Sequence, residues 1–385
     1  MPEHAVRVVI AIDKFKGSLS ASEVTKHLIS GLLSADSSLI VDALAVADGG
    51  EGTLEAALVA GFTRHPVTVA GPTGMPVDAA IAVQGDKAII ETALACGLQA
   101  LPDGVVDPLG ATSLGAGQLI RAALDLGCRE IVVGVGGSAC TDGGAGLLVG
   151  LGARLRDKDG VDLALGGGEL ARVVDIDLDG LHAGIGSTQF VLAGDVSNPL
   201  LGVRGAAAVY APQKGASPDE VMLLEAALTN YANVFIDEVG ADALRALSAS
   251  GSGAAGGIGF AVIVALHARR QLGIDFVREL TRLDDRLKGA DLVITGEGSL
   301  DDQSLEGKTP FGVAQSAARM GVAAIAVCGR TTLSEQQLTG IGFTRTLSLM
   351  DLEPDAAKSI SGAAALLEQT GKTVGLSMRE LTSKM

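Results

Sequence analysis

The sequence predicts an α/β protein with two domains: a doubly wound parallel sheet and an inserted domain with a mixed sheet. Near both ends of the chain, short apolar runs rich in β-branched residues alternate with helical patterns, as in the strand–helix units of a parallel sheet. Several of these runs end abruptly in glycine and charged residues. The middle of the chain begins instead with polar–apolar alternation, which favours antiparallel or mixed strands.

Composition limits the classes of protein to which the chain can belong. Its 385 residues suffice for two domains, and no run approaches the roughly 18 uninterrupted apolar residues of a membrane span. The amino terminus shows no signal-peptide pattern, so we expect a cytoplasmic protein without a membrane partner. The formal net charge of −16 argues against a nucleic-acid partner. It also means that an anionic ligand needs lysines, backbone amides or a metal close by.

The cysteines and histidines do not predict a metal site. The four cysteines show no CxxC or zinc spacing and stand among small or apolar residues, so we expect buried free thiols. They are Cys96, Cys128, Cys140 and Cys328. Five scattered histidines likewise disfavour a zinc enzyme.

The chain opens with a strand and a capped helix. Residues 6–12 predict a buried strand that runs into the polar segment 13–18, DKFKGS. Ser20 and Glu23 form a capping-box pattern, which begins a helix that reaches about residue 33.

A second strand–loop–helix unit follows. Residues 39–47 predict a strand that ends in the charged glycine-rich segment 48–53, and a helix continues to about residue 60. Because parallel strands present their carboxyl ends to one crevice, we expect Asp13 and Asp48 to point into the same space.

The pattern changes after residue 70, where we expect a domain boundary. Alternation over residues 64–83, interrupted by a turn at 71–74, predicts a meander that another short run at 87–91 extends. A helix is expected at 114–126 and a strand at 130–135.

The stretch with the most glycine follows that strand. Five glycines between residues 136 and 146 let the backbone approach a ligand closely and present amides at the start of a helix expected at 144–151. Ser138, Thr141 and Asp142 add two hydroxyls and a carboxylate. We interpret the loop as an anion cradle, although a glycine-rich loop alone is weak support. It is not a Walker loop, because neither GKT segment has the required preceding glycine.

A further strand at 190–193 ends at Asp195 and Asn198. These side chains could bind a metal or accept a proton, or they could form an Asx-type turn before Pro199, and the residues do not decide between the two. A helix is expected from Pro218 to about residue 239, and the glycine loop 250–259 leads into another helix. Such a loop is as often a hinge or a close contact as a ligand site.

The stretch 291–309, DLVITGEGSLDDQSLEGKT, carries the densest group of charged residues at a strand end. Residues 292–295 predict a buried parallel strand that Gly296-Glu297-Gly298 terminates. Acids and one lysine follow within a few residues, which favours a metal and phosphate site over a solvated loop. They are Glu297, Asp301, Asp302, Glu306 and Lys308.

The strand–helix pattern of the amino terminus returns from here to residue 370, with one helix expected over 355–370. The simplest topology therefore joins both ends of the chain in one doubly wound domain, residues 1–70 with 287–385. The second α/β domain, residues 71–286, is inserted between them, and ligands commonly bind between such domains.

These motifs, in this order, resemble the glycerate kinase family of the bacterial type that phosphorylates D-glycerate. The similarity runs from the first strand to at least Gly329 and rests on DKFKGSLSA (13–21), ADGGEGT (47–53), GPTGMPV (71–77), IIETALACGL (89–98), VGVGGSACTDGGAG (133–146), GDVSNPLLG (194–202), APQKGA (211–216), GSGAAGGIG (251–259) and ITGEGSLDDQSLEGKTPFGVA (294–314). The resemblance implies a discontinuous flavodoxin-like domain with an inserted domain. It also implies transfer of the ATP γ-phosphate to a hydroxyl of D-glycerate, with 2-phosphoglycerate and ADP as the expected products. We expect a monomer or homodimer.

Phosphoryl transfer needs charge neutralisation, positioning and a group that takes the hydroxyl proton. We expect Glu297 and Asp301, with Asp195 or Asp48, to hold Mg²⁺. Asp195 is the first candidate for the catalytic base and Asp48 the second. The remaining predicted residues bind phosphate or the glycerate carboxylate: Lys14 (with a catalytic role), Lys16, Ser18, Gly137, Ser138, Thr141, Asp142 and Lys308.

Three alternatives remain at this point. The same kinase could give 3-phosphoglycerate. A dinucleotide-dependent oxidoreductase would need GxGxxG after the first strand, and DKFKGS does not supply it. A hydroxy-acid-binding protein without turnover would explain two domains but not so many acids and lysines at strand ends.

Overall fold

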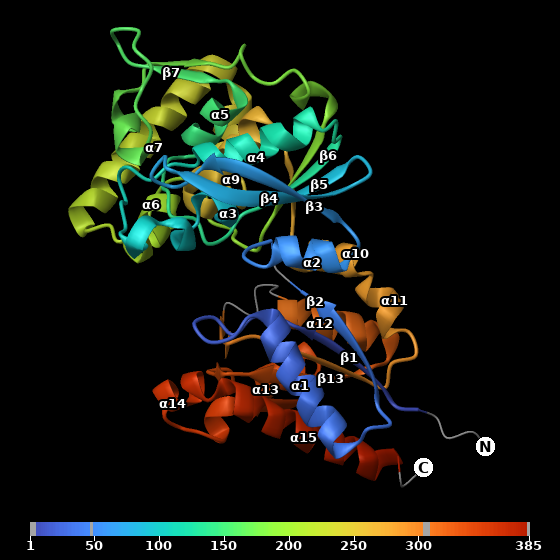
Figure 1. Cartoon of the computed structure of the whole chain (residues 1–385). Helices are drawn as coiled ribbons and strands as arrows, with labels where there is room; N and C mark the ends of the chain where they lie inside the picture. The colour runs from blue at the N-terminus through green and yellow to red at the C-terminus, as the bar shows by residue number, and fades with distance from the viewer. Residues whose placement is uncertain (1–4, 47–48, 303–308, 383–385) are drawn as a thin grey trace. The chain divides into compact units, whose positions relative to one another are not determined.

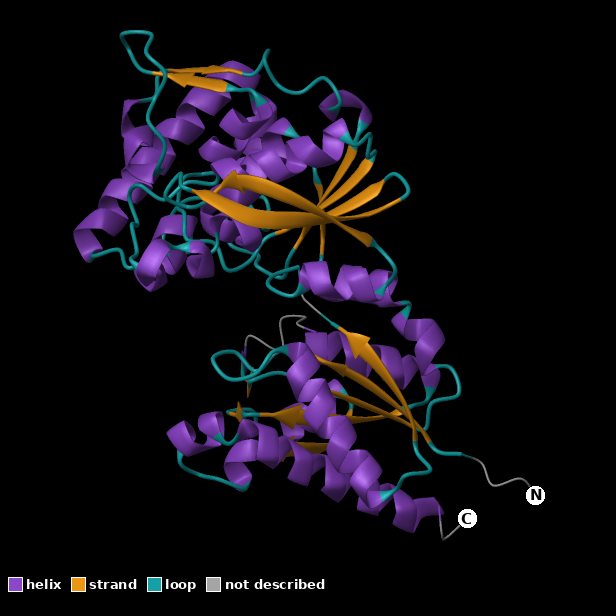
Figure 2. Ribbon diagram, viewed as in Figure 1, coloured by secondary structure: helices purple, strands orange, loops and turns teal. Residues whose placement is uncertain are grey.

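The structure, a computed structural model, describes residues 5–46, 49–302 and 309–382, and divides the chain into two compact units. The terminal unit consists of residues 1–48 and 273–385, and the central unit of residues 49–272. Figures 1 and 2 show a sheet with helices in each. The boundaries expected at residues 70 and 286 differ from both junctions. Strand β3 (Thr63–Ala70) pairs with the central sheet, and α10 (Gly273–Thr281) and α11 (Leu283–Leu287) contact α12 of the terminal unit.

The terminal unit contains a parallel sheet of five strands in the order β15-β13-β11-β1-β2. The strands are β1 (Arg7–Ile12), β2 (Ile40–Ala45), β11 (Leu292–Gly296), β13 (Ala323–Cys328) and β15 (Phe343–Ser348). Counted along the chain, this is the order 2-1-3-4-5 of flavodoxin-like folds, with the switch point between β1 and β11. A short parallel pair, β12 (Ser299–Leu300) and β14 (Arg330–Thr331), lies beyond the sheet.

Helices cover both faces of this sheet. Ser20 caps α1 (Ala21–Ala35) in the predicted capping box with Glu23. Helices α1 and α15 (Ala363–Thr382) pack together and share a core with Val8, Ile10 and Ile12 of β1. On the other face, α12 (Thr309–Met320) lies against β11 and β13, and α13 (Glu335–Ile341) contacts β15.

One predicted helix is wrong. The helix expected over 355–370 is two helices, α14 (Ala356–Ser361) and α15. Asp355 caps the first with its side chain, and the first ends at Gly362, whose φ of −95° and ψ of 6° depart from helical geometry.

The central unit contains a mixed sheet of six strands in the order β10-β9-β6-β5-β4-β3. Its strands are β3, β4 (Pro76–Gln84), β5 (Lys87–Glu91), β6 (Glu130–Gly134), β9 (Gln189–Ala193) and β10 (Arg269–Gln271). Strands β3, β4 and β5 form the predicted antiparallel meander, and β5, β6, β9 and β10 run parallel. The ribbon of β7 (Arg154–Arg156) and β8 (Asp175–Asp177) was not expected.

Helices surround this sheet and enclose the larger core. They are α2 (Thr53–Val59), α3 (Ala93–Cys96), α4 (Leu114–Asp125), α5 (Ala145–Leu151), α6 (Ala206–Tyr210), α7 (Pro218–Val239), α8 (Ala241–Leu247) and α9 (Ala254–Ala265). Tyr231, Phe235 and Phe260 meet edge to face with ring centroids 5.1–6.0 Å apart. Among the described residues, no helix has the length and apolar character needed to cross a bilayer.

Candidate active site

The loops after β1 and β11 start side by side at the switch point of the terminal sheet. Ile12 pairs with Gly296, and the Asp13 amide donates a 3.0 Å hydrogen bond to the Gly296 carbonyl. A Cβ built on Gly298 would lie 3.1 Å from the Lys16 amide nitrogen, so the two backbones almost touch. This edge is where open α/β sheets of this order bind ligands.

The loop after β1 is a closed turn anchored in the core. The buried Phe15 accepts backbone hydrogen bonds from Ser18 and Leu19, and Gly17 supplies the positive φ of 79° that the turn requires. Lys14 is half-buried and Lys16 is exposed. The Ser18 hydroxyl donates to the carbonyl of Ile360 at 2.8 Å, so its proton is engaged within the terminal unit.

The loop after β11 carries the two predicted metal ligands. Glu297 and Asp301 are half-buried on either side of β12, which pairs with β14 and so holds the loop. No group of three or more potential ligand side chains occurs among the described residues. Mg²⁺ commonly binds one or two carboxylates together with phosphate and water, so the donor chemistry of Glu297 and Asp301 fits that ion. Lys308 lies outside the described residues.

In the central unit, Asp142 organises the glycine-rich loop from inside. Its fully buried carboxylate accepts hydrogen bonds of 2.8 Å from both the amide and the hydroxyl of Ser113. It also accepts from the amides of Gly144 and Gly146 at 3.1 and 3.3 Å. These bonds tie the loop to the start of α4 and to the start of α5. Sequence reasoning missed Ser113, and no local signal distinguishes it.

A buried lysine holds the same loop from the other side. Lys214, only 3% exposed, donates to the Ser138 hydroxyl at 2.9 Å and to the Cys140 carbonyl. Burial lowers the pKa of Lys214, against the smaller raising influence of Cys140, Cys96 and Asp142. The sequence shows this lysine in the APQKGA segment, but nothing in that segment reveals its burial.

The predicted anion-binding residues of this loop differ in exposure. Gly137 is exposed and has a φ of 66°, whereas Ser138 is 4% exposed and Thr141 is fully buried. The Thr141 hydroxyl has no hydrogen-bond partner among the described residues. The loop therefore presents the Gly136–Gly137 backbone to solvent, and its other polar groups face inward.

Glycines bring three loops of the central unit together. A Cβ on Gly134 would lie 2.3 Å from the Gly49 carbonyl oxygen, and one on Gly49 would lie 2.5 Å from that of Ala193. The start of the segment 49–53 therefore rests on the carboxyl ends of β6 and β9. Asp48, its sequence neighbour, lies outside the described residues.

Asp195 follows β9 at this same edge and is half-buried. The neighbouring Asn198 has a local role, since its amide donates to the Arg204 carbonyl and accepts from the Tyr210 hydroxyl. These hydrogen bonds reach residues 6 and 12 positions further along the chain and are not those of an Asx-type turn, so both alternatives for Asp195 and Asn198 stay predictions.

Glu91 is a site-supporting residue that sequence reasoning missed. It is 4% exposed, and its carboxylate accepts from the amides of Gly52 and Leu54 at 3.2 and 3.0 Å. Those amides lie at the start of α2, whose N-cap glycine has no side chain to cap the helix.

The four cysteines are buried and free as expected, and burial raises the pKa of Cys328 to about 12.

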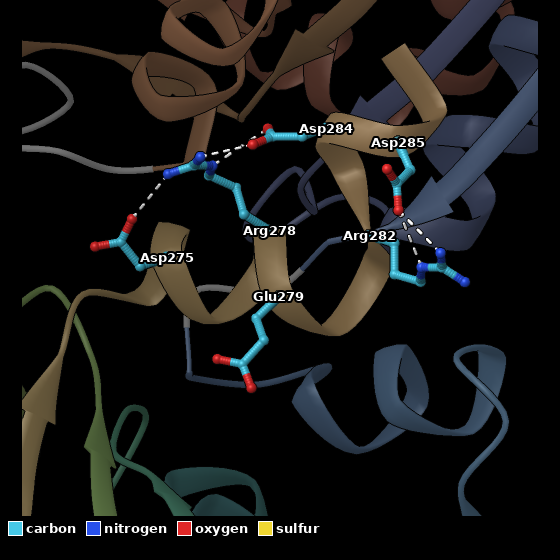
Figure 3. A pocket seen from close by; sticks show the side chains of 6 residues that line it. All are labelled: Asp275, Arg278, Glu279, Arg282, Asp284 and Asp285. Carbon is cyan, nitrogen blue, oxygen red and sulfur yellow. Dashed lines mark hydrogen bonds and ion pairs between the residues drawn. The ribbon is translucent and has the colours of Figure 1, made fainter. Parts of the chain in front are cut away.

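The terminal unit also has a charged surface hollow, formed by elements other than the loops after β1 and β11 (Figure 3). Its volume is about 410 Å³, and residues of α10 and α11 line it. Arg278 binds Asp284 and Asp275 there, and Arg282 binds Asp285. Since carboxylates of the chain itself already pair with both lining arginines, this hollow offers neither of these cations free to an anionic ligand.

The terminal unit carries a flavodoxin-like sheet with lysines and acids at its switch point, and the central unit carries a glycine-rich loop held by buried charges. Both features are typical of an α/β phosphotransferase. The glycerate kinase family model matches residues 8–379. The chain therefore belongs to the glycerate kinase family, and the predicted ATP-dependent kinase class is confirmed.

Individual proteins agree with this assignment. A glycerate kinase of Bacillus subtilis is 37% identical, over 97% of this chain and 98% of its own. The glycerate 2-kinase of Escherichia coli is 41% identical, over 85% of this chain and 86% of its own. The crystal structure of a putative glycerate kinase 2 from Salmonella typhimurium superposes with a TM-score of 0.81 at 39% identity, covering 99% of this chain and all of that one.

Proposed function

We propose that this kinase transfers the γ-phosphate of ATP to the 2-hydroxyl of D-glycerate, giving 2-phosphoglycerate and ADP. Family membership over nearly the whole chain supports glycerate as the acceptor. The observation that carries the choice of hydroxyl is the similarity to a relative named glycerate 2-kinase.

In this proposal the terminal unit binds phosphate. Lys14 and Lys16, on the closed turn after β1, neutralise phosphate oxygens, and Lys308 adds a third cation. Glu297 and Asp301 hold Mg²⁺, which supplies further charge neutralisation when bound.

The central unit contributes the anion cradle and the base. The backbone of the half-buried Gly136 and the exposed Gly137 receives an anionic group, with Ser138 beside it. Asp142 and Lys214 act indirectly, because their hydrogen bonds hold this loop in place before substrate arrives. Asp195, half-buried at the end of β9, takes the hydroxyl proton, and Asp48 is the second candidate.

The test is incubation of the purified protein with Mg-ATP and D-glycerate, with the product resolved by ³¹P NMR. A phosphorus signal coupled to a single proton identifies the 2-phosphate and supports the proposal. A signal coupled to two protons identifies the 3-phosphate and overturns the choice of hydroxyl. Absence of ADP formation from folded protein would overturn D-glycerate as the acceptor. Omission of Mg²⁺ with added chelator should abolish turnover.

A further inference from the structure

Arg270 is the middle residue of β10, the edge strand of the central sheet. Strand β10 runs parallel to β9, with Arg270 opposite Leu192 and Gln271 opposite Ala193. The Gly194 amide donates to the Gln271 carbonyl at 3.2 Å. This register places Arg270 beside the loop that carries Asp195.

The guanidinium of Arg270 is only partly engaged. Its Nη2 donates to the carbonyls of Gly194, Asp195 and Val196 at 3.4, 3.2 and 3.3 Å, all longer than the usual 2.9–3.0 Å. Its Nε is buried and has no hydrogen-bond acceptor among the described residues.

Arg270 also differs in its charge environment from the arginines that bind a carboxylate. Arg156, Arg278 and Arg286, for example, each bind a carboxylate. Arg270 forms no ion pair with any described carboxylate, although it is half-buried. An arginine is always charged, and a desolvated cation without a counter-charge is costly to keep. The neutral carbonyls around Nη2 reduce that cost without cancelling the charge.

The glycine loop 251–259 makes room for this side chain. A Cβ built on Gly251 would lie 3.2 Å from both Cδ and Nε of Arg270, and Gly251 has a φ of 91°. The loop that the sequence left as either hinge, close contact or ligand site therefore accommodates the guanidinium here.

We propose that Arg270 is a substrate-binding residue that takes an oxyanion of the substrate beside Asp195. The proposal rests on the proposed function and deepens it. In D-glycerate the carboxylate and the 2-hydroxyl are on adjacent carbons, so a residue that binds the carboxylate must lie next to the base that serves that hydroxyl. Arg270 contacts the backbone of the proposed base directly. A nucleotide phosphate offers the same chemistry and is the other source to be tested.

The experiment compares Arg270→Gln with Arg269→Gln, using steady-state kinetics on the full chain. Arg269 is the adjacent, exposed arginine of the same strand, and its replacement changes the net charge equally. We expect R270Q to raise the KM for D-glycerate about 10- to 150-fold, as the loss of hydrogen bonds to a charged group predicts. R269Q should leave it unchanged, and Arg270→Lys should restore part of the affinity.

The neutral amide D-glyceramide separates binding from a merely structural role. If Arg270 binds the carboxylate, the R270Q substitution weakens the binding of D-glycerate. It leaves the weak affinity for D-glyceramide unchanged. If R270Q instead raises the KM for ATP alone, a phosphate is the oxyanion that Arg270 binds, which also supports the proposal. If R270Q loses affinity for D-glycerate and for D-glyceramide equally, the proposal is overturned. The same holds if the kinetic constants of R270Q equal those of R269Q. Urea unfolding of both variants shows whether an activity loss reflects folding.

The role of Arg270 can still be tested if the proposed function is wrong. If wild-type protein does not phosphorylate D-glycerate, calorimetric titration of D-glycerate and of inorganic phosphate still compares the two variants. Weaker binding of either anion to R270Q than to R269Q supports the role of Arg270. Identical binding by the two variants refutes it.

Discussion

Lys214 donates a 2.9 Å hydrogen bond from its buried ammonium to the hydroxyl of Ser138, 76 positions earlier in the chain. On the other side of the same loop, Asp142 accepts hydrogen bonds from Ser113 and from two glycine amides. A buried cation and a buried anion thus hold the glycine-rich loop. Glycine makes such a loop adaptable, and these bonds restrict it to one conformation.

Replacement of Asp142 by Asn should destabilise the central unit. Asparagine keeps the volume but turns an amide NH₂ toward groups that donate to the carboxylate, so buried donors lose their acceptor. We expect a loss of about 1–3 kcal/mol in the free energy of unfolding, measured by urea titration. Asp179→Asn, at an exposed position, is the control and should change stability little. Equal midpoints for the two variants would contradict the structural role of Asp142.

Lys214 makes stability depend on pH in a defined direction. Burial lowers its native pKa below the ordinary 10.5 that we assign to the unfolded chain. Between those two values the unfolded state binds more protons, so this group makes the free energy of unfolding rise with pH. The cost of the buried charge is fully present below the native pKa and is lost progressively as the pH rises from that value to 10.5.

The comparison of wild type with Lys214→Met tests this sign. Their difference in free energy of unfolding should shift in favour of wild type as the pH rises toward 10.5, measured by urea titration at several values. Lys158→Met, at a side chain 79% exposed, should give a curve parallel to wild type. A K214M curve that is also parallel would show that Lys214 does not titrate differently on folding.

Two helical glycines should respond oppositely to alanine. A Cβ on Gly31 of α1 would lie 2.1 Å from the Glu368 carbonyl oxygen of α15, so Gly31→Ala should cost about 1–3 kcal/mol. Gly340 of α13 has nothing within 4 Å of its Cβ position, so Gly340→Ala should gain about 0.5 kcal/mol from helix propensity. Thermal unfolding of both variants measures the contrast. A stabilised G31A would show that α1 and α15 can separate at little cost.

Asp195→Asn tests the proposed base. Loss of a general base should lower kcat about 10²- to 10⁴-fold with a smaller effect on KM, measured by ADP release with D-glycerate. Asp159→Asn, at a side chain 65% exposed and ion-paired with its neighbour Lys158, is the matched control. Wild-type turnover by D195N, with unchanged dependence on Mg²⁺, would refute both the base and the metal role given to this residue.

Much of the fold was predictable because its signals are local. The capping box of Ser20 and Glu23 begins α1 as expected, and the alternation over residues 64–83 forms the β3–β4 pair. Strand β10 was not predictable. Its sequence, Arg-Arg-Gln, has no apolar alternation, and only the pairing with β9 makes it a strand.

In the candidate site, too, some features were predictable from local sequence and others were not. Motif order along the chain was sufficient to recognise the family and to locate the glycine-rich loops and the charged strand ends, because these depend on residue type and spacing. The functions of single side chains depend on burial and on distant partners. Asp142 and Lys214 lie inside the protein as loop supports, Glu91 caps a helix that begins 38 positions before it in the chain, at Thr53, and Arg270 stands without a carboxylate partner among the described residues. Only tertiary contacts determine these environments, because the free energy of a charge depends on the groups and solvent around it and not on its neighbours in sequence.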